Sequence, residues 1–142
     1  MTSWRDTASL QTQADLDGLL NVVMPFAERM LAEHGAFYPF GAVVDIDGET
    51  QMLGGDPALG EHPDPAAVIT SMYDAVRGSA RLRAVVLAAD VRVGEADAVR
   101  VDLEHVEGEA LAALFPYVRN DETTEVTFGE PTAVEADRRI WP

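Results

Sequence analysis

The chain of 142 residues contains no cysteine and no lysine. Without cysteine there can be no disulfide, no thiol nucleophile and no zinc site built on thiolates. Without lysine there can be no Schiff-base catalysis, no covalently held pyridoxal phosphate and no phosphate-binding loop that depends on a lysine. These two absences exclude several classes of enzyme before any motif is considered.

Long apolar runs are missing as well. No run approaches the roughly 20 residues that cross a bilayer, and the N-terminus lacks the basic head and apolar stretch of a secretory signal. We therefore expect a cytoplasmic protein that does not engage membranes. The hydrophobic fraction of 47% is ordinary for a globular protein, and 142 residues suffice for one domain with a substantial core.

Basic residues are few, since 10 arginines stand against 25 acidic residues and leave a net charge of −15. Both halves of the chain share this excess: residues 1–71 carry 2 basic and 11 acidic residues, and residues 72–142 carry 8 and 14. A field of this sign repels a phosphate backbone, so we expect no binding to nucleic acid. The same field favours cationic ligands, which makes a basic protein a candidate partner.

The first helix is expected from Asp15 to His34, because apolar residues recur there every three or four positions and Gly35 is a suitable left-handed end. The apolar stripe comprises Leu16, Leu19, Leu20, Val23, Phe26, Ala27, Met30 and Leu31. Pro25 lies inside this pattern and predicts a kink or, alternatively, a break into two helices. Residues 1–12 show no periodicity and are expected to form a poorly ordered lead-in.

A hairpin and a second helix follow. Alternating apolar residues over 40–46 lead into Asp47-Gly48, a pair typical of a two-residue type I′ turn with both residues at positive φ, and the chain returns over 49–53. The second helix should begin at Asp64 as N-cap with Pro65 in the first helical position, and Gly78 should end it.

The remaining residues indicate antiparallel strands at 82–93 and 99–106, a short helical turn at 109–114, and further strands at 114–119, 124–128 and 132–140. The order α-β-β-α-β-β-β-β-β predicts one α+β domain, residues 1–142, whose antiparallel sheet of about five to seven strands carries two main helices on one face. The strands at 82–93 and 99–106 are long and apolar, and a bare edge of either would pair with another copy. We therefore expect a homodimer; the alternative is that segment 107–114 covers this edge.

Motifs for metal binding and catalysis are not found in this sequence. The three histidines have no spacing typical of metal ligands, and the acidic run at 45–49 has its glycine at position four rather than at position six of a calcium loop. None of the four serines lies in a G-x-S-x-G elbow. We accordingly expect no catalytic residues, no bound metal and no cofactor.

The aromatic segment 37–40 is the most distinctive in the chain and admits two interpretations. It can anchor the first strand beneath the first helix, or it can line a pocket between helix and sheet with residues 115–117 opposite. His105 is similarly open, either as a histidine at the edge of the core or as a ligand-binding or proton-transfer group. The candidate ligand-binding residues are Tyr38, Phe40, His105 and Tyr117.

Four segments together resemble an uncharacterised bacterial protein family. They are GAFYPFGA at 35–42, the DG turn at 47–48, DAVRVDLEH at 97–105 and PY at 116–117. The resemblance spans most of residues 15–140 and implies one compact bacterial domain. No activity and no catalytic residues follow from this resemblance.

These observations favour a non-catalytic binding or regulatory module, of which an acidic neutralising protein of the immunity type is one form. The alternative is a small enzyme or a carrier of a small ligand that uses a pocket between the first helix and the sheet. A deep pocket that joins Tyr38, His105 and Tyr117 would favour the alternative.

Overall fold

The computed structural model describes residues 4–142, and its helices and strands follow the predicted α+β order closely. The helices are α1 (Trp4–Thr7), α2 (Leu10–His34) and α3 (Pro65–Arg77), with a 3-10 turn, η1, at Pro57–Leu59. The strands are β1 (Phe40–Asp45), β2 (Thr50–Leu53), β3 (Leu82–Val93), β4 (Ala96–His105), β5 (Ala110–Arg119), β6 (Val126–Phe128) and β7 (Thr132–Val134). The predicted fold class is confirmed.

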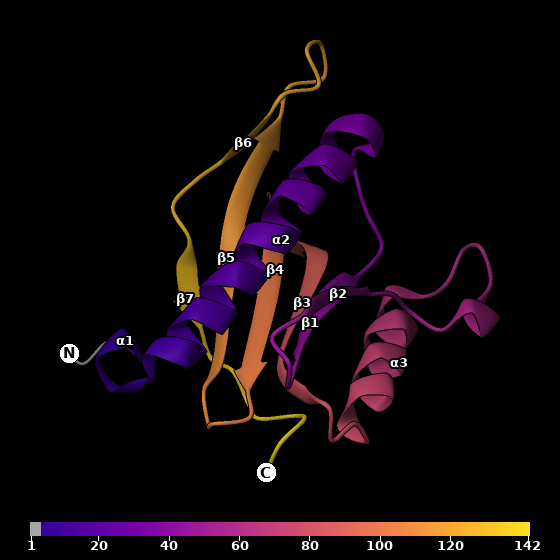
Figure 1. Ribbon diagram of the computed structural model, residues 1–142. Helices are drawn as coiled ribbons and strands as arrows, with labels where there is room; N and C mark the ends of the chain where they lie inside the picture. The colour runs from indigo at the N-terminus through magenta and orange to yellow at the C-terminus, as the bar shows by residue number, and fades with distance from the viewer. Residues whose placement is uncertain (1–3) are drawn as a thin grey trace.

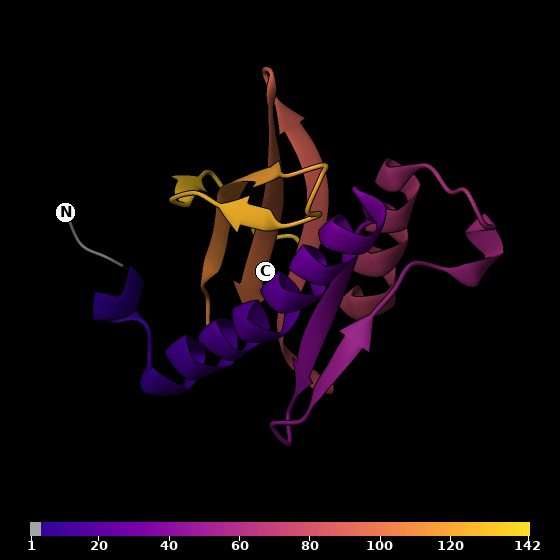
Figure 2. The same ribbon diagram turned by 90° about the horizontal axis from the view of Figure 1, so that it is seen from above.

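All the strands join one curled antiparallel sheet with the order β2-β1-β3-β4-β5-β6 (Figures 1 and 2). The outer edge of β5 is shared, because β6 pairs with its residues 117–119 and β7 with its residues 112–114. Strands β3 and β4 are interior: β3 lies between β1 and β4, and β4 lies between β3 and β5. Neither strand therefore has the bare edge on which the expectation of a homodimer was based, because β5 covers the outer side of β4.

Helix α2 begins earlier than its apolar stripe suggested. Ser9 is its N-cap and accepts a hydrogen bond from Thr12 N, and Gly35 ends it in the left-handed conformation, with φ 77°. The helix runs through Pro25 without a break. Residues 4–12, expected to be a poorly ordered lead-in, form α1 and the first turn of α2. The residues of the lead-in before Trp4 lie outside the described part of the chain.

The two main helices cover opposite faces of the sheet, which corrects the expectation that they share one face. In Figure 1, α2 crosses the sheet in front of the strands, and its apolar side packs on alternate strand residues such as Ala42 and Val86. The intervening residues, such as Val43, Val85 and Leu87, form a second core with α3. Successive strand residues point to opposite faces. The unbroken burial of β3 from residue 84 to 88 reflects this covering on both sides.

The β1–β2 hairpin is confirmed, but its turn is not the predicted type. Asp45 N donates to Glu49 O, and Gly48 N donates to Asp45 O, so the loop has three residues. Gly48 has φ 87°, whereas Asp47 is not at positive φ. This is the pattern of a type I turn followed by a glycine bulge. The carboxylate of Asp45 accepts the N–H groups of Asp47 and Glu49, so this acid orders the turn.

Two predictions for the last third of the chain are corrected. Residues 109–114 do not form a helical turn, because residues 110–117 of β5 pair with β4. The strand predicted over 132–140 is confined to β7, and the residues after it have no regular structure. Segment 135–142 instead crosses the α3 side of the sheet, where Ile140 and Trp141 pack on the second core.

Candidate functional site

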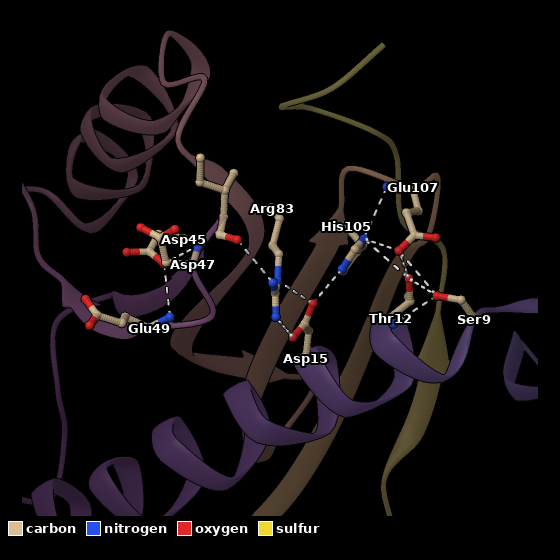
Figure 3. A network of polar contacts seen from close by, with 10 residues as sticks. Ser9, Thr12, Asp15, Asp45, Asp47, Glu49, Arg83, His105 and Glu107 are labelled. Atoms are coloured by element: carbon tan, nitrogen blue, oxygen red, sulfur yellow. Dashed lines mark hydrogen bonds and ion pairs between the residues drawn. The ribbon is translucent and has the colours of Figure 1, made fainter.

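A buried carboxylate, Asp15, joins α2 to both central strands (Figure 3). Arg83, near the start of β3, donates from Nε to Asp15 Oδ2 and from Nη2 to Asp15 Oδ1, each at 2.9 Å. His105, at the end of β4, has its Nε2 2.9 Å from the same Oδ2. Asp15 is 8% exposed and His105 is 1% exposed. Residues up to 90 positions apart in the chain therefore meet at one carboxylate.

The second ring nitrogen of His105 is occupied as well. The backbone N–H of Glu107 donates to Nδ1 at 3.1 Å, which leaves the proton on Nε2, where it is donated to Asp15. Thr12 Oγ1 lies 3.4 Å from Nδ1 but donates to Glu107 Oε2 at 3.1 Å. Ser9 adds a further contact to Glu107 Oε2 at 3.3 Å.

A hydroxyl, an imidazole and a carboxylate thus lie together, as they do in serine hydrolases, but their geometry does not suit nucleophilic catalysis. In a hydrolase the ring nitrogen that faces the hydroxyl must be free to take its proton. Here that nitrogen already accepts the N–H of Glu107, and Thr12 is 1% exposed. Among the residues that the structure describes, no buried side-chain nitrogen or oxygen lacks a hydrogen-bond partner. The arrangement supports a role for His105 in the fold.

Sequence analysis did not identify Thr12 and Asp15. Thr12 fell within the supposed lead-in, and Asp15 was placed off the apolar stripe. The sequence nevertheless indicated that both residues are buried. Leu16 lies four positions after Thr12, Leu19 lies four positions after Asp15, and both leucines are buried. Residues four apart share a helix face, so two polar residues at the buried face require buried partners.

A groove lies at the other end of the sheet, between the end of α2 and the β3–β4 and β5–β6 turns, with a volume of about 960 Å³. We call it the Tyr117 groove. Its lining residues are Gly35, Ala36, Asp90, Glu95, Ala96, Asp97, Pro116, Tyr117, Val118, Arg119, Asp121, Thr127, Phe128 and Gly129. Four of these residues are acidic and one is basic.

The basic residue of the groove, Arg119, is already bound. Its Nε donates to Leu31 O at 2.9 Å, its Nη2 donates to Ala32 O at 3.0 Å, and its Nη1 donates to Asp121 Oδ1 at 3.1 Å. Arg119 therefore satisfies carbonyl groups in the last turn of α2, where the helix dipole is negative. Its charge is directed to the helix end and Asp121 rather than to the acids across the groove.

Tyr117 and Asp90 form a short contact in the groove. The Tyr117 hydroxyl donates to Asp90 Oδ1 at 2.6 Å, and Tyr117 is 8% exposed. Burial raises the pKa of Asp90 above its usual value, and Asp97 adds to the rise; the hydrogen bonds from Tyr117 and from the backbone of Phe37 oppose it. Burial, followed by the hydrogen bond to Asp90, raises the pKa of Tyr117, so this phenol stays protonated.

The four predicted site residues lie in four different places. Phe40 is in the main core and packs against Phe26 and Phe37, with ring centroids 4.8 and 5.4 Å apart. Tyr38 is 47% exposed and lines a surface hollow of about 470 Å³ with residues of α2. Tyr117 pairs with Asp97, eight residues along β4 from His105, or about 26 Å at 3.3 Å per residue. The enzyme or carrier alternative requires one pocket that joins Tyr38, His105 and Tyr117. Such a pocket would have to extend over all of these separate places.

Three observations bear on other classes of function. Within residues 4–142, no group of three or more histidine, aspartate and glutamate side chains is arranged to hold a metal ion. Although α2 has 25 residues, neither it nor another helix in the described part of the chain is apolar enough over a sufficient length to cross a membrane. No protein-family model, curated protein or solved structure matches the chain.

Proposed function

We propose that this protein is a non-catalytic binding module of the cytoplasm, and that its Tyr117 groove takes an arginine- or lysine-bearing segment of a basic partner protein. The observation that carries the proposal is the groove itself, which has four carboxylates in its lining. Its guanidinium, on Arg119, is already bound to carbonyl groups of α2 and to Asp121. Arg92 Nη1 lies 3.4 Å from Asp97 Oδ1, so Asp97 is already paired through one of its oxygens. A cationic side chain in the groove would find the carboxylate of Glu95, the second oxygen of Asp97 and the negative end of a helix.

The state of Asp90 supports this role. The raised pKa of Asp90 means that the folded protein disfavours its ionised form relative to the unfolded chain. The burial of Asp90 and the nearby Asp97 thus cost stability, and the hydrogen bond from Tyr117 offsets only part of that cost. Residues kept at a cost to stability are characteristic of binding sites. A cation bound in the groove would stabilise the ionised form of Asp90 and remove that cost.

The overall charge supports the same partner. A net charge of −15 on a 142-residue chain attracts a basic protein over long distances and accelerates the encounter. The tyrosine and phenylalanine in the groove, Tyr117 and Phe128, pack edge to face with ring centroids 6.3 Å apart. Aromatic rings beside carboxylates suit a guanidinium, which binds both. An immunity-type protein that neutralises a basic toxin would have these properties.

Removing two groove charges should weaken binding of a cationic probe by about tenfold, since each exposed ion pair contributes up to about 1 kcal/mol. The variant is Glu95→Gln/Asp97→Asn, and the probe is a capped peptide of alternating glycine and arginine, titrated calorimetrically. The matched control is Glu61→Gln/Asp74→Asn, which removes the same charge at two positions that do not line the groove. Equal weakening in both variants would show that net charge rather than the groove binds the peptide.

The same titration should depend on pH with a defined sign. Because the pKa of Asp90 is raised, part of its population must lose a proton before it can pair with a cation. Affinity should therefore increase as the pH is raised from about 4 through the pKa of Asp90, and Asp90→Asn should reduce that increase. A pH profile that is the same in Asp90→Asn would contradict the part assigned to Asp90.

We also propose that the protein forms a homodimer, through a contact different from the one first expected. The outer edge of β2 has no neighbour among the strands that the structure describes, and Met52 on it is 51% exposed. Antiparallel pairing of two β2 edges would extend the sheet across a two-fold axis. Sedimentation at micromolar concentration should detect the dimer, more of it at about 0.15 M salt than at low salt because screening reduces self-repulsion. Met52→Glu should give a monomer, and a wild-type monomer at both salt concentrations would contradict the proposal.

A further inference from the structure

Segment 135–142 is attached to the sheet by side chains rather than by strand pairing. Its residues have no strand assignment. Glu104 of β4 accepts the successive backbone N–H groups of Arg139, Ile140 and Trp141 at 2.8–3.2 Å. Arg77 of α3 donates from Nε to Arg139 O at 2.7 Å. A run of main-chain N–H groups around one carboxylate is an anion-binding arrangement formed within a single chain.

The carboxylate that holds the segment is itself buried. Glu104 is 5% exposed, and it lies in the middle of the sheet, between Val85 of β3 and Ala110 of β5. The hydrogen bonds found for its side chain all come from the backbone of this segment. A buried carboxylate requires such partners, because an unpaired buried charge is strongly unfavourable. Whatever covers this face must therefore supply several N–H donors to Glu104.

The segment also makes apolar contacts with the core and places an arginine against an aromatic ring. Ile140 and Trp141 pack on the core formed with α3. The guanidinium groups of Arg139 and Arg77 each lie 5.4 Å from the ring centre of Tyr73. Beneath Ile140 a cavity of about 10 Å³ remains, lined in part by Tyr73 and Glu104, which is about the space of one water molecule. The segment thus fits this face through an arginine, an aliphatic side chain and an aromatic side chain in succession.

We infer that the face around Glu104 and Tyr73 is a peptide-binding surface, and that segment 135–142 is its resident occupant. An extended segment of a partner protein, with an arginine followed by an aliphatic and an aromatic residue, binds there by displacing it. This surface is on the α3 side of the sheet, so the inference does not depend on the Tyr117 groove. In strand addition, a recurrent mode of peptide recognition, main-chain hydrogen bonds give affinity and side-chain pockets give specificity. Here the carboxylate of Glu104 takes the place of the strand edge as the acceptor of main-chain N–H groups.

The chain's own segment provides the probe. A capped, dye-labelled peptide with the sequence of residues 135–142, EADRRIWP, has two acidic and two basic residues, so attraction to the acidic protein does not drive its binding. In the full chain, Ile140→Ala/Trp141→Ala loosens the resident segment and leaves the face intact. Adding Glu104→Gln removes the charge that collects the N–H groups. A peptide of the same composition in scrambled order is the control.

The labelled peptide should bind Ile140→Ala/Trp141→Ala at least about tenfold more tightly than the wild type, because the resident segment competes less well. Adding Glu104→Gln should cancel that gain, and circular dichroism should show that all variants are folded. Equal affinity for wild type and the loosened variant, or for the scrambled peptide, would overturn the inference. So would failure of the folded, loosened variant to bind. A wild-type dimer that Glu104→Gln abolishes and Met52→Glu spares would identify the occupant as a second copy and overturn the assignment to a partner.

Discussion

Replacing Asp15 by alanine should lower the free energy of unfolding by about 3 kcal/mol, because it leaves a partly buried guanidinium and a buried imidazole without their shared acceptor. The side chain of Asp15 is 8% exposed and that of Arg83 is 20% exposed, so solvent cannot fully replace the lost contacts. Urea denaturation followed by circular dichroism should show a lower midpoint with an unchanged slope.

The same helix offers a matched control in Asp17. Its two carboxylate oxygens bind Arg5 at 2.6 and 2.8 Å, which is as good a geometry as that of Asp15 and Arg83. Both partners of this second pair are exposed, at 41% and 49%. Asp17→Ala makes the same change in helix propensity and should leave the midpoint almost unmoved. Equal losses in the two variants would show that burial does not govern the contribution of Asp15.

Replacing Gly41 by alanine should lower the free energy of unfolding by about 3 kcal/mol through a steric conflict that no side-chain rotation can relieve. A Cβ atom at position 41 would lie close to the carbonyl oxygen of Val86, a backbone atom of the neighbouring strand β3, and 3.3 Å from its carbonyl carbon. Strand β1 would have to move away from β3, and the hydrogen bonds between them would weaken. Thermal and urea denaturation should both report the loss.

A second glycine provides the opposite expectation for the same substitution. Gly18 is exposed in the interior of α2, and a Cβ atom there would meet no atom within 4 Å. Gly18→Ala should therefore stabilise the protein by about 0.5–1 kcal/mol, because alanine loses less backbone entropy in a helix than glycine. If both variants lost stability to the same extent, the contact between Gly41 and Val86 would not be the cause.

Parts of the candidate sites could be inferred from the sequence, and parts could not. The location of His105 on the inner face followed from the alternation of Val101, Leu103 and His105 along one strand. Its partner Asp15 could not be named, because 25 acidic residues offer too many candidates and the two residues are 90 positions apart. The pairing of Tyr117 with Asp90 depends likewise on β3, β4 and β5 lying side by side in a particular register.

The sequence by itself determined what depends on neighbouring residues. Asp64 with Pro65 begins α3, Gly35 ends α2 in the left-handed conformation, and the glycine of the acidic turn closes the β1–β2 hairpin. Each of these follows from the backbone freedom or side-chain hydrogen bonding of one or two residues. Even there, the length of the turn escaped prediction, because Asp45 stabilises three loop residues where two were expected.

Tertiary structure alone decided which face each helix covers and where segment 135–142 binds. The apolar residues of β3 are buried on both faces, and a run of this kind is compatible with helices on one side or on two. Whether the helices share one face or cover both depends on how strands that are far apart in the chain pair into one sheet with two apolar faces. Glu104 likewise could not be placed from the local pattern. A glutamate in an alternating strand is typical of a solvent-exposed face. This one is buried because a segment some 35 residues later supplies its N–H donors. Local pattern sets the elements, and the pairing of distant polar and apolar groups sets their arrangement.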